Sequence, residues 1–113
     1  MAMGKGAFLG EFEQLVLLAL LRLGNEGYGM VVRQELEATT GRPVTIGAVY
    51  ATLARLEEKK LLSSWRVEPE PHRGGRSRRF FRVEDAGRAV LAESRGMMDR
   101  MWAGVDLADE ASS

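Results

Sequence analysis

Arginine is the side chain with the clearest chemical purpose in this sequence, and it gathers in one short segment. Between His72 and Arg82 there are five arginines and no acidic residue. A guanidinium group binds phosphate or guanine through paired hydrogen bonds, and arginine also enters narrow minor grooves. The segment therefore favours contact with nucleic acid. We expect this contact from Arg73, Arg76, Arg78 and Arg79.

The arginine cluster is also compatible with roles that do not involve DNA. The chain has 13 arginines and 3 lysines, a bias that a GC-rich genome also produces. Charged side chains protect an exposed strand edge, and Arg73-Gly74-Gly75 alone is a weak signature of RNA binding. The strand-like segments on both sides argue against a disordered RNA-binding tail. The arginine cluster contains no acid and follows a helix that is narrow enough for the major groove. Of these interpretations, a loop that contacts DNA therefore agrees best with the sequence.

That preceding helix is expected to run from Ile46 to about Lys60, with Thr45 as its N-cap. Its core stripe at positions i, i+4 and i+7 is Val49, Leu53 and Leu56. Thr52 lies near that stripe, so we expect it in the core. The pattern indicates a helix with one buried face and one free face.

The free face carries the second group of candidate DNA contacts: Thr45, Gly47, Ala48, Tyr50 and Arg55. The small Gly47 and Ala48 would let the helix approach closely, while Tyr50 would contact phosphate. Arg55 would contact a phosphate or a base edge. The alternative is structural: Tyr50 would pack beneath the hairpin, and Arg55 would pair with a neighbouring glutamate, Glu57 or Glu58.

Helical and strand-like patterns alternate along the rest of the chain. The first helix has apolar residues at helical spacing from Phe12 to Leu23, and Leu17, Leu18 and Leu21 add a second apolar face. We expect this helix to be buried nearly all round, with its far side against a partner subunit. It should end at Gly24-Asn25.

The remaining elements predict the fold class. We expect a turn at 26–29, a helix at 29–40, strands at 62–67 and 79–83 joined by a long hairpin tip, and a final helix from 85 to about 104. The order is that of a winged helix-turn-helix, mostly α with a small antiparallel β-hairpin, plus a C-terminal helix. We place the DNA-binding domain at 1–84 and the C-terminal dimerisation helix and tail at 85–113.

The final helix has a soft apolar surface made of Met97, Met98, Met101 and Trp102. Dimer packing, together with Leu17 of the first helix, is the simpler interpretation. The sharper hypothesis is a ligand slot at the dimer centre, where Trp102 would stack on a flat aromatic molecule.

Composition excludes several classes of function. The formal net charge is zero, the pI is about 6.6, and there is no cysteine. His72 is the only histidine, so a zinc site is not expected. No catalytic motif is present, and we expect neither enzymatic activity nor a cofactor. The longest apolar run, Leu15 to Leu21, is too short for a membrane span, and the N-terminus lacks secretory character. We expect a cytoplasmic protein.

The neutral net charge leaves one alternative function open. A winged helix can also bind a protein partner and never touch DNA. Steep salt dependence of DNA binding would discriminate against this alternative.

Several segments together resemble the PadR family of bacterial transcriptional regulators, over about Phe8 to Leu91. They are Leu9 to Leu21, Tyr28-Gly29, Gly41 to Tyr50, Leu53 to Leu62, and Arg73 to Arg76. The resemblance implies a homodimer, joined through C-terminal helices, that represses transcription, often in response to a small hydrophobic molecule. The short chain is similar to the compact branch of the family, with a single C-terminal helix.

One position departs from the family pattern. Glu84 stands where the family usually has a threonine that caps the last helix, and we expect Asp85 to cap instead.

Taken together, the sequence predicts a dimeric repressor on a near-palindromic operator. Its two recognition helices would enter successive major grooves, one helical turn apart.

Overall fold

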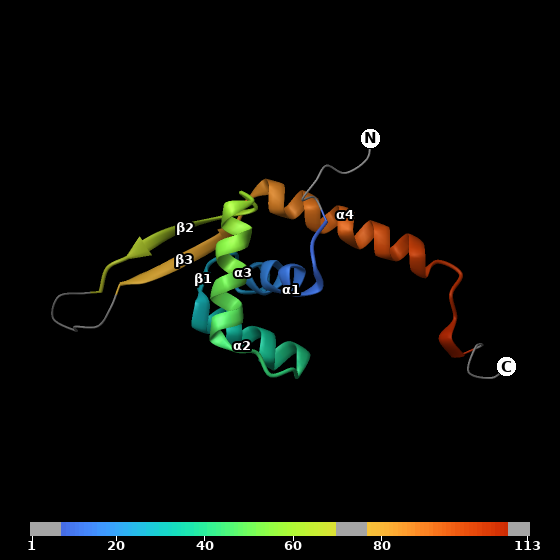
Figure 1. Ribbon diagram of the computed structural model, residues 1–113, viewed down its shortest axis with the longest axis horizontal. Helices are drawn as coiled ribbons and strands as arrows, with labels where there is room; N and C mark the ends of the chain where they lie inside the picture. The colour runs from blue at the N-terminus through green and yellow to red at the C-terminus, as the bar shows by residue number, and fades with distance from the viewer. Residues whose placement is uncertain (1–7, 70–76, 109–113) are drawn as a thin grey trace.

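Four helices and three short strands make up the part of the chain that the computed structural model describes, residues 8–69 and 77–108. Figure 1 shows the hairpin projecting to one side of the three central helices and the fourth helix extending to the other. In chain order the elements are α1 (Glu11–Arg22), β1 (Gly27–Tyr28), α2 (Gly29–Thr40), α3 (Ile46–Glu58), β2 (Leu62–Val67), β3 (Arg78–Val83) and α4 (Asp85–Trp102).

The core forms where α1, α2 and α3 meet one face of the sheet. Its fully buried side chains include Leu17 and Leu20 from α1, Val32 from α2, and Leu53 from α3. Leu17 is 0% exposed, so its predicted place at a ligand or dimer interface is wrong. Leu18 is 43% exposed in the protomer, so burial of the far side of α1 against a partner subunit stays a prediction.

The sheet has the strand order β1-β3-β2 and is antiparallel throughout. Phe80 of β3 stands between Tyr28 of β1 and Trp65 of β2. Side chains alternate between the faces of a strand, and the neighbouring Phe81 is 3% exposed in the core. The strand β1 was predicted as a turn. Two residues are too few to show an alternating pattern.

Asn25 ties the end of α1 to the sheet. Its backbone has a left-handed φ of 61°, which asparagine tolerates better than most residues. Its amide nitrogen donates to the Val83 carbonyl (3.1 Å), and its side-chain oxygen accepts from the Val83 backbone N–H (2.7 Å). A single side chain thus satisfies both backbone groups of the last residue of β3.

The start of α4 is packed closely against the turn before β2. The Leu61 backbone N–H bonds to the end of α3, and the Leu61 carbonyl accepts from Glu84. Gly87 is buried, and the packing is so close that a Cβ there would collide with that carbonyl. Glu84 is the N-cap residue, its side chain accepts a hydrogen bond from Ser63, and the predicted cap by Asp85 is wrong.

The rest of α4 has few neighbours. Gly87 and Ser94 are its buried residues, and every described residue from Met98 onward is exposed. Figure 1 shows the C-terminal half of α4 leading away from the other helices. Among the described residues, no helix is long and apolar enough to cross a membrane.

Candidate nucleic-acid interface

The helix α3 presents the free face that its sequence pattern predicts. Val49, Leu53 and Leu56 are fully buried, and Thr52 is 2% exposed. Thr45 caps the helix, since its hydroxyl accepts a hydrogen bond from the Ala48 backbone N–H at 3.1 Å. Gly47, Ala48, Tyr50, Ala51 and Ala54 are all exposed. Nothing lies within 4 Å of the position that a Gly47 Cβ would occupy, so this surface is open in the protomer.

Two side chains of α2 fix the entry of the chain into α3. The Arg33 guanidinium donates to the Val44 carbonyl at 2.8 Å. The Glu37 carboxylate accepts from the Val44 backbone N–H at 2.9 Å. Both groups of Val44 are therefore held by one helix, just before the Thr45 cap. These contacts were not predicted from the sequence, because the spacing of residues does not show which helical side chains reach a loop residue that follows the helix.

Tyr50 is half-exposed and lies over the first residue of α2. A Cβ at Gly29 would fall 2.7 Å from both the Cε1 and the hydroxyl oxygen of Tyr50. The ring therefore rests where glycine leaves room for it, and its alternative placement beneath the hairpin is wrong. The side chain is 49% exposed, which leaves it available to a ligand that approaches α3.

Arg55 is bound within the protein. Its guanidinium donates to the Thr52 hydroxyl at 3.1 Å and lies 3.8 Å from the Glu13 carboxylate of α1. The alternative that it pairs with Glu57 or Glu58 is wrong about the partner. Half of the Arg55 side chain is exposed, so a DNA contact would share the guanidinium with Glu13.

Glu13 is the centre of a small charged cluster at the far end of α3. It accepts from Lys59 at 2.9 Å and from the Gly10 backbone N–H at 3.0 Å. Burial alone would raise the pKa of Glu13, but the hydrogen bonds from Lys59 and Gly10, with the charges of Lys59 and Arg55, lower it overall from its ordinary value of 4.5. Glu13 is thus a carboxylate at neutral pH, and it offsets positive charge beside α3.

The two described wing arginines lie on opposite faces of β3. Arg78 stacks over the Tyr28 ring, with its guanidinium carbon 4.4 Å from the ring centroid. Arg79 donates to the Ser64 hydroxyl at 2.7 Å. Arg73 and Arg76 lie outside the described residues. Two further arginines of the sheet have contacts that were not predicted: Arg66 donates to Ser77 at 3.0 Å, and Arg82 lies over Trp65.

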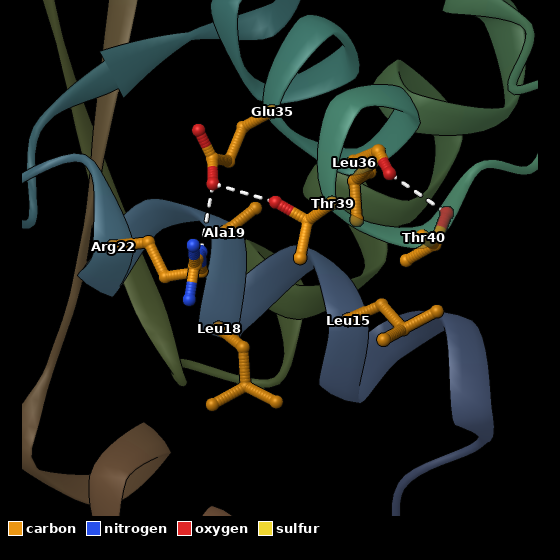
Figure 2. A pocket seen from close by; sticks show the side chains of 8 residues that line it. All are labelled: Leu15, Leu18, Ala19, Arg22, Glu35, Leu36, Thr39 and Thr40. Atoms are coloured by element: carbon orange, nitrogen blue, oxygen red, sulfur yellow. Dashed lines mark hydrogen bonds and ion pairs between the residues drawn. The ribbon is translucent and has the colours of Figure 1, made fainter.

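Two concave surfaces flank α1, away from the free face of α3. The pocket between α1 and α2 has a volume of about 250 Å³. Figure 2 shows Arg22 and Thr39 pointing toward the same oxygen of Glu35, at 2.7 and 2.9 Å. Their hydrogen bonds, that from Arg22 first, lower the pKa of Glu35. The rest of the lining is mainly apolar: Leu15, Leu18, Ala19, Leu36 and the aliphatic part of Thr40.

The second concave surface is a groove of about 650 Å³ between α1 and α4. Leu18 and Leu21 line it from α1, and Leu91 and Met98 from α4. Met98 thus belongs to both this groove and the predicted ligand or dimer set, and Met97 is partly buried. Met101 and Trp102 are exposed by 72% and 52%. The described residues bring together no group of acidic or histidine side chains that could hold a metal ion.

This arrangement of helices and wing agrees with a family match over most of the chain. The model of the "Transcriptional regulator PadR-like family" matches residues 17–93. The chain belongs to the PadR-like family. This confirms the predicted family and its function in transcription regulation. It also places the protein among regulators, not enzymes.

Relatives of this PadR-like protein support the same conclusion. Transcriptional regulator Rv3488 of Mycobacterium tuberculosis (strain ATCC 25618 / H37Rv) is 39% identical over 77 residues, which are 68% of this chain and 67% of the relative. A PadR family transcriptional regulator from Eggerthella lenta DSM 2243 has a similar structure, with a TM-score of 0.66 and 28% identity over 83% of this chain and 81% of the other.

The winged-helix fold also recurs at lower sequence identity. F93 from STIV, a winged-helix DNA-binding protein, has a TM-score of 0.67 and 14% identity, and the match covers 88% of this PadR-like chain and 99% of the other. At that identity the similarity concerns the fold alone. Helices, antiparallel sheet and wing thus confirm the predicted fold class.

Proposed function

We propose that this PadR-like regulator acts as a homodimeric repressor on a near-palindromic operator, with α3 in the major groove and the wing beside it. The observation that carries the proposal is the open face of α3. Gly47 and Ala48 project no bulk from it, and Tyr50 stands at its edge. A major groove admits a helix of this width. A DNA target would also place the protein in the cytoplasm.

Within this proposal the contacts have different tasks. Tyr50 and the Thr45 cap would hold phosphates, while Gly47 and Ala48 would allow a close approach to base edges. Arg55 would contribute only the part of its guanidinium that Glu13 leaves free. The wing contacts would come from Arg78 and Arg79, and from Arg73 and Arg76 beyond the described residues.

A salt titration of DNA binding tests the proposed face. Wild-type protein and the variants Tyr50→Ala, Arg78→Ala and Arg79→Ala would be titrated by fluorescence anisotropy against DNA from upstream of the gene and against a scrambled duplex. Each arginine variant should weaken binding to both duplexes and reduce the slope of log affinity against log salt by about 1 per protomer contact.

The matched control is Arg22→Ala. It removes another exposed arginine, which lines the α1–α2 pocket, and should leave DNA affinity unchanged. Unchanged affinity in Tyr50→Ala, Arg78→Ala and Arg79→Ala would refute the proposed DNA face. If wild-type protein bound neither duplex, or bound both equally and without salt dependence, a winged helix that serves a protein partner would replace this proposal.

The dimer is proposed from the C-terminal half of α4 and the residues after it. Met98, Met101, Trp102, Val105 and Leu107 are exposed by 48–72%. An apolar surface of this extent commonly marks an interaction site. A second copy would cover it by two-fold symmetry, which would also place two α3 helices on one face.

Met101→Arg tests the dimer, because it would bury a charge at the proposed interface. We expect monomers in sedimentation or light scattering, and a large loss of operator affinity. Ala89→Arg adds the same charge to an exposed position near the start of α4 and should remain dimeric. A Met101→Arg protein that is still dimeric would show that the interface lies elsewhere.

We also propose a flat aromatic effector between Trp102 and Met97 of the two protomers. Support comes from the exposed Trp102 ring, which stacking would cover, and from adaptable methionines beside it. Titration of flat aromatic compounds should quench the fluorescence of the wild type but not of Trp102→Phe. An effector relieves repression only if it favours the geometry that does not fit the operator.

A further inference from the structure

Tyr28 lies at the point where the wing meets the helix-turn-helix. It is the second residue of β1, paired with Phe80 in the central strand of the sheet. It is also the N-cap residue of α2, and the next residue, Gly29, contacts the recognition helix through Tyr50. No other described element separates α2 from the wing at this point. Tyr28 is therefore placed to transmit the position of one to the other.

The Tyr28 ring is held by aromatic contacts on the outward face of the sheet. Its centroid lies 5.3 Å from that of Phe80, edge-on at 68°. Phe80 in turn stacks on Trp65 at 5.9 Å. Aromatic pairs of this kind stabilise beyond the area that they bury. The ring thus has a fixed position that derives from all three strands.

The face of that fixed ring is occupied by Arg78. The guanidinium carbon lies 4.4 Å from the ring centroid, well within the range of a cation–π interaction. The ring attracts the positive charge of the guanidinium, and no hydrogen bond joins the Arg78 side chain to another described residue. The interaction therefore orders Arg78 without using the donors that a phosphate needs.

We propose that Tyr28 is a positioning residue for DNA binding: its ring orders the Arg78 guanidinium in advance, with N–H donors that bond to no other described residue and can bind a phosphate. The inference rests on the proposed DNA contact of Arg78. A long side chain that is ordered only on binding lowers affinity through lost rotamer freedom. Arg78 is exposed on a projecting hairpin, where this loss would be largest. Tyr28 would contribute to affinity without touching DNA.

The sheet contains a second pair that serves as an internal control. Arg82 lies over Trp65, with its guanidinium carbon 4.9 Å from the ring centroid. It is four residues further along β3, roughly 13 Å closer to the body of the protein. The chemistry of the pair is the same, but its position is at the base of the wing. We expect Arg82 to have no coupling with Tyr28 in DNA binding.

The test is a double-mutant cycle on operator affinity in the full chain. Tyr28→Leu removes the ring, Arg78→Ala removes the guanidinium, and the double variant removes both. Tyr28→Leu alone should weaken binding about 2- to 5-fold, the size of an exposed cation–π interaction. In the Arg78→Ala background the same change should have no further effect. Tyr28→Phe keeps the aromatic face and should bind like the wild type.

Two readouts separate positioning from a general structural role. The slope of log affinity against log salt should fall in Tyr28→Leu toward that of Arg78→Ala. The side-chain δ-protons of Arg78, which lie near the ring, should shift downfield in the NMR spectrum of Tyr28→Leu but not of Tyr28→Phe. A loss of fold would instead reduce thermal stability and weaken binding in every background, including Arg82→Ala.

The outcomes are distinct. If Arg78→Ala weakens binding and Tyr28→Leu weakens it by the same factor in both backgrounds, the positioning role is overturned while the proposed DNA face stands. If Arg78→Ala binds operator as tightly as the wild type, the wing contact is overturned and the inference with it. Coupling that is confined to the Tyr28 and Arg78 pair, with additive behaviour of Tyr28→Leu and Arg82→Ala, supports it.

Discussion

Replacing Gly29 with alanine should weaken DNA binding without weakening the fold. The new methyl group would occupy space that the Tyr50 ring now fills, 2.7 Å from its Cε1 and hydroxyl oxygen. The backbone of Gly29 is not left-handed, so alanine fits it without strain. The ring is the end of a half-exposed side chain and can swing outward. The substitution therefore changes the direction of Tyr50 and little else.

The size of both effects follows from the geometry. Carbon atoms in contact sit about 3.5 Å apart or more, so the ring must move by roughly 1 Å. A shift of this size breaks a hydrogen bond from the hydroxyl to a phosphate, which contributes about 1.5–3 kcal/mol when the acceptor is charged, or about 10- to 150-fold in affinity. Alanine at the start of α2 should stabilise the fold by up to about 1 kcal/mol relative to glycine, less the cost of moving the ring.

The assay combines thermal unfolding with anisotropy titration of four proteins: wild type, Gly29→Ala, Tyr50→Ala and the double variant. If Gly29→Ala acts through the ring, it has no effect on affinity once Tyr50 is alanine. Operator affinity that is unchanged in Gly29→Ala would refute this reasoning. An equal loss in both backgrounds would refute it as well, because α2 itself would then be the part that moves.

Three further predictions concern stability. Gly87→Ala should destabilise the protein by about 1–3 kcal/mol in denaturant unfolding, because a methyl group there meets the rigid Leu61 carbonyl and not a mobile side chain. Asn25→Ala should lower the free energy of unfolding by about 2–3 kcal/mol. It leaves the Val83 N–H and carbonyl without their partners, and it puts alanine at a left-handed backbone position. Glu13→Gln should cost about 1–2 kcal/mol at pH 7, through the weakened contact with Lys59, and the difference from the wild type should disappear in acid.

The sign of the acid effect follows from the pKa of Glu13. That pKa is lowered in the folded protein, so the folded state favours the carboxylate. The resulting stability is present above the ordinary value of 4.5 and is lost as pH falls through the lowered pKa. Unfolding curves measured from pH 7 to pH 3 check this. A constant difference between Glu13→Gln and the wild type across that range would contradict it. The Asn25 prediction has its own check: Asn25→Asp keeps the acceptor for the Val83 N–H, and it should be more stable than Asn25→Ala.

Sequence patterns were sufficient for elements that depend on periodicity or on local caps. The buried stripe of α3, the Thr45 cap and the bounds of α2 all follow from residues within a few positions of one another. The pattern failed for β1, whose two residues become a strand only because β3 lies beside them. It also failed for the apolar face of α1, where Leu17 and Leu18 are equally hydrophobic and only the packing decides which is buried.

The candidate site shows the same division. The residues on the free face of α3 could be predicted, but their partners could not. Arg55 forms an ion pair with Glu13, 42 positions away, and not with the nearer Glu57 or Glu58. Arg78 has its partner in Tyr28, which belongs to a different supersecondary element. Contacts of this kind depend on the tertiary arrangement. A local sequence pattern does not show how far apart two elements lie in the folded protein.

The helix α3 is fastened at both ends, and this limits how the regulator can respond to a signal. Arg33 and Glu37 hold its entry, while Glu13 holds Lys59 just beyond its last turn. A helix of 13 residues, about 20 Å long, that is tethered at each end moves only with the rigid body around it. In a dimer, an effector would therefore alter the separation or tilt between the two α3 helices without changing either helix. Control would consist of matching or mismatching the half-site spacing of the operator.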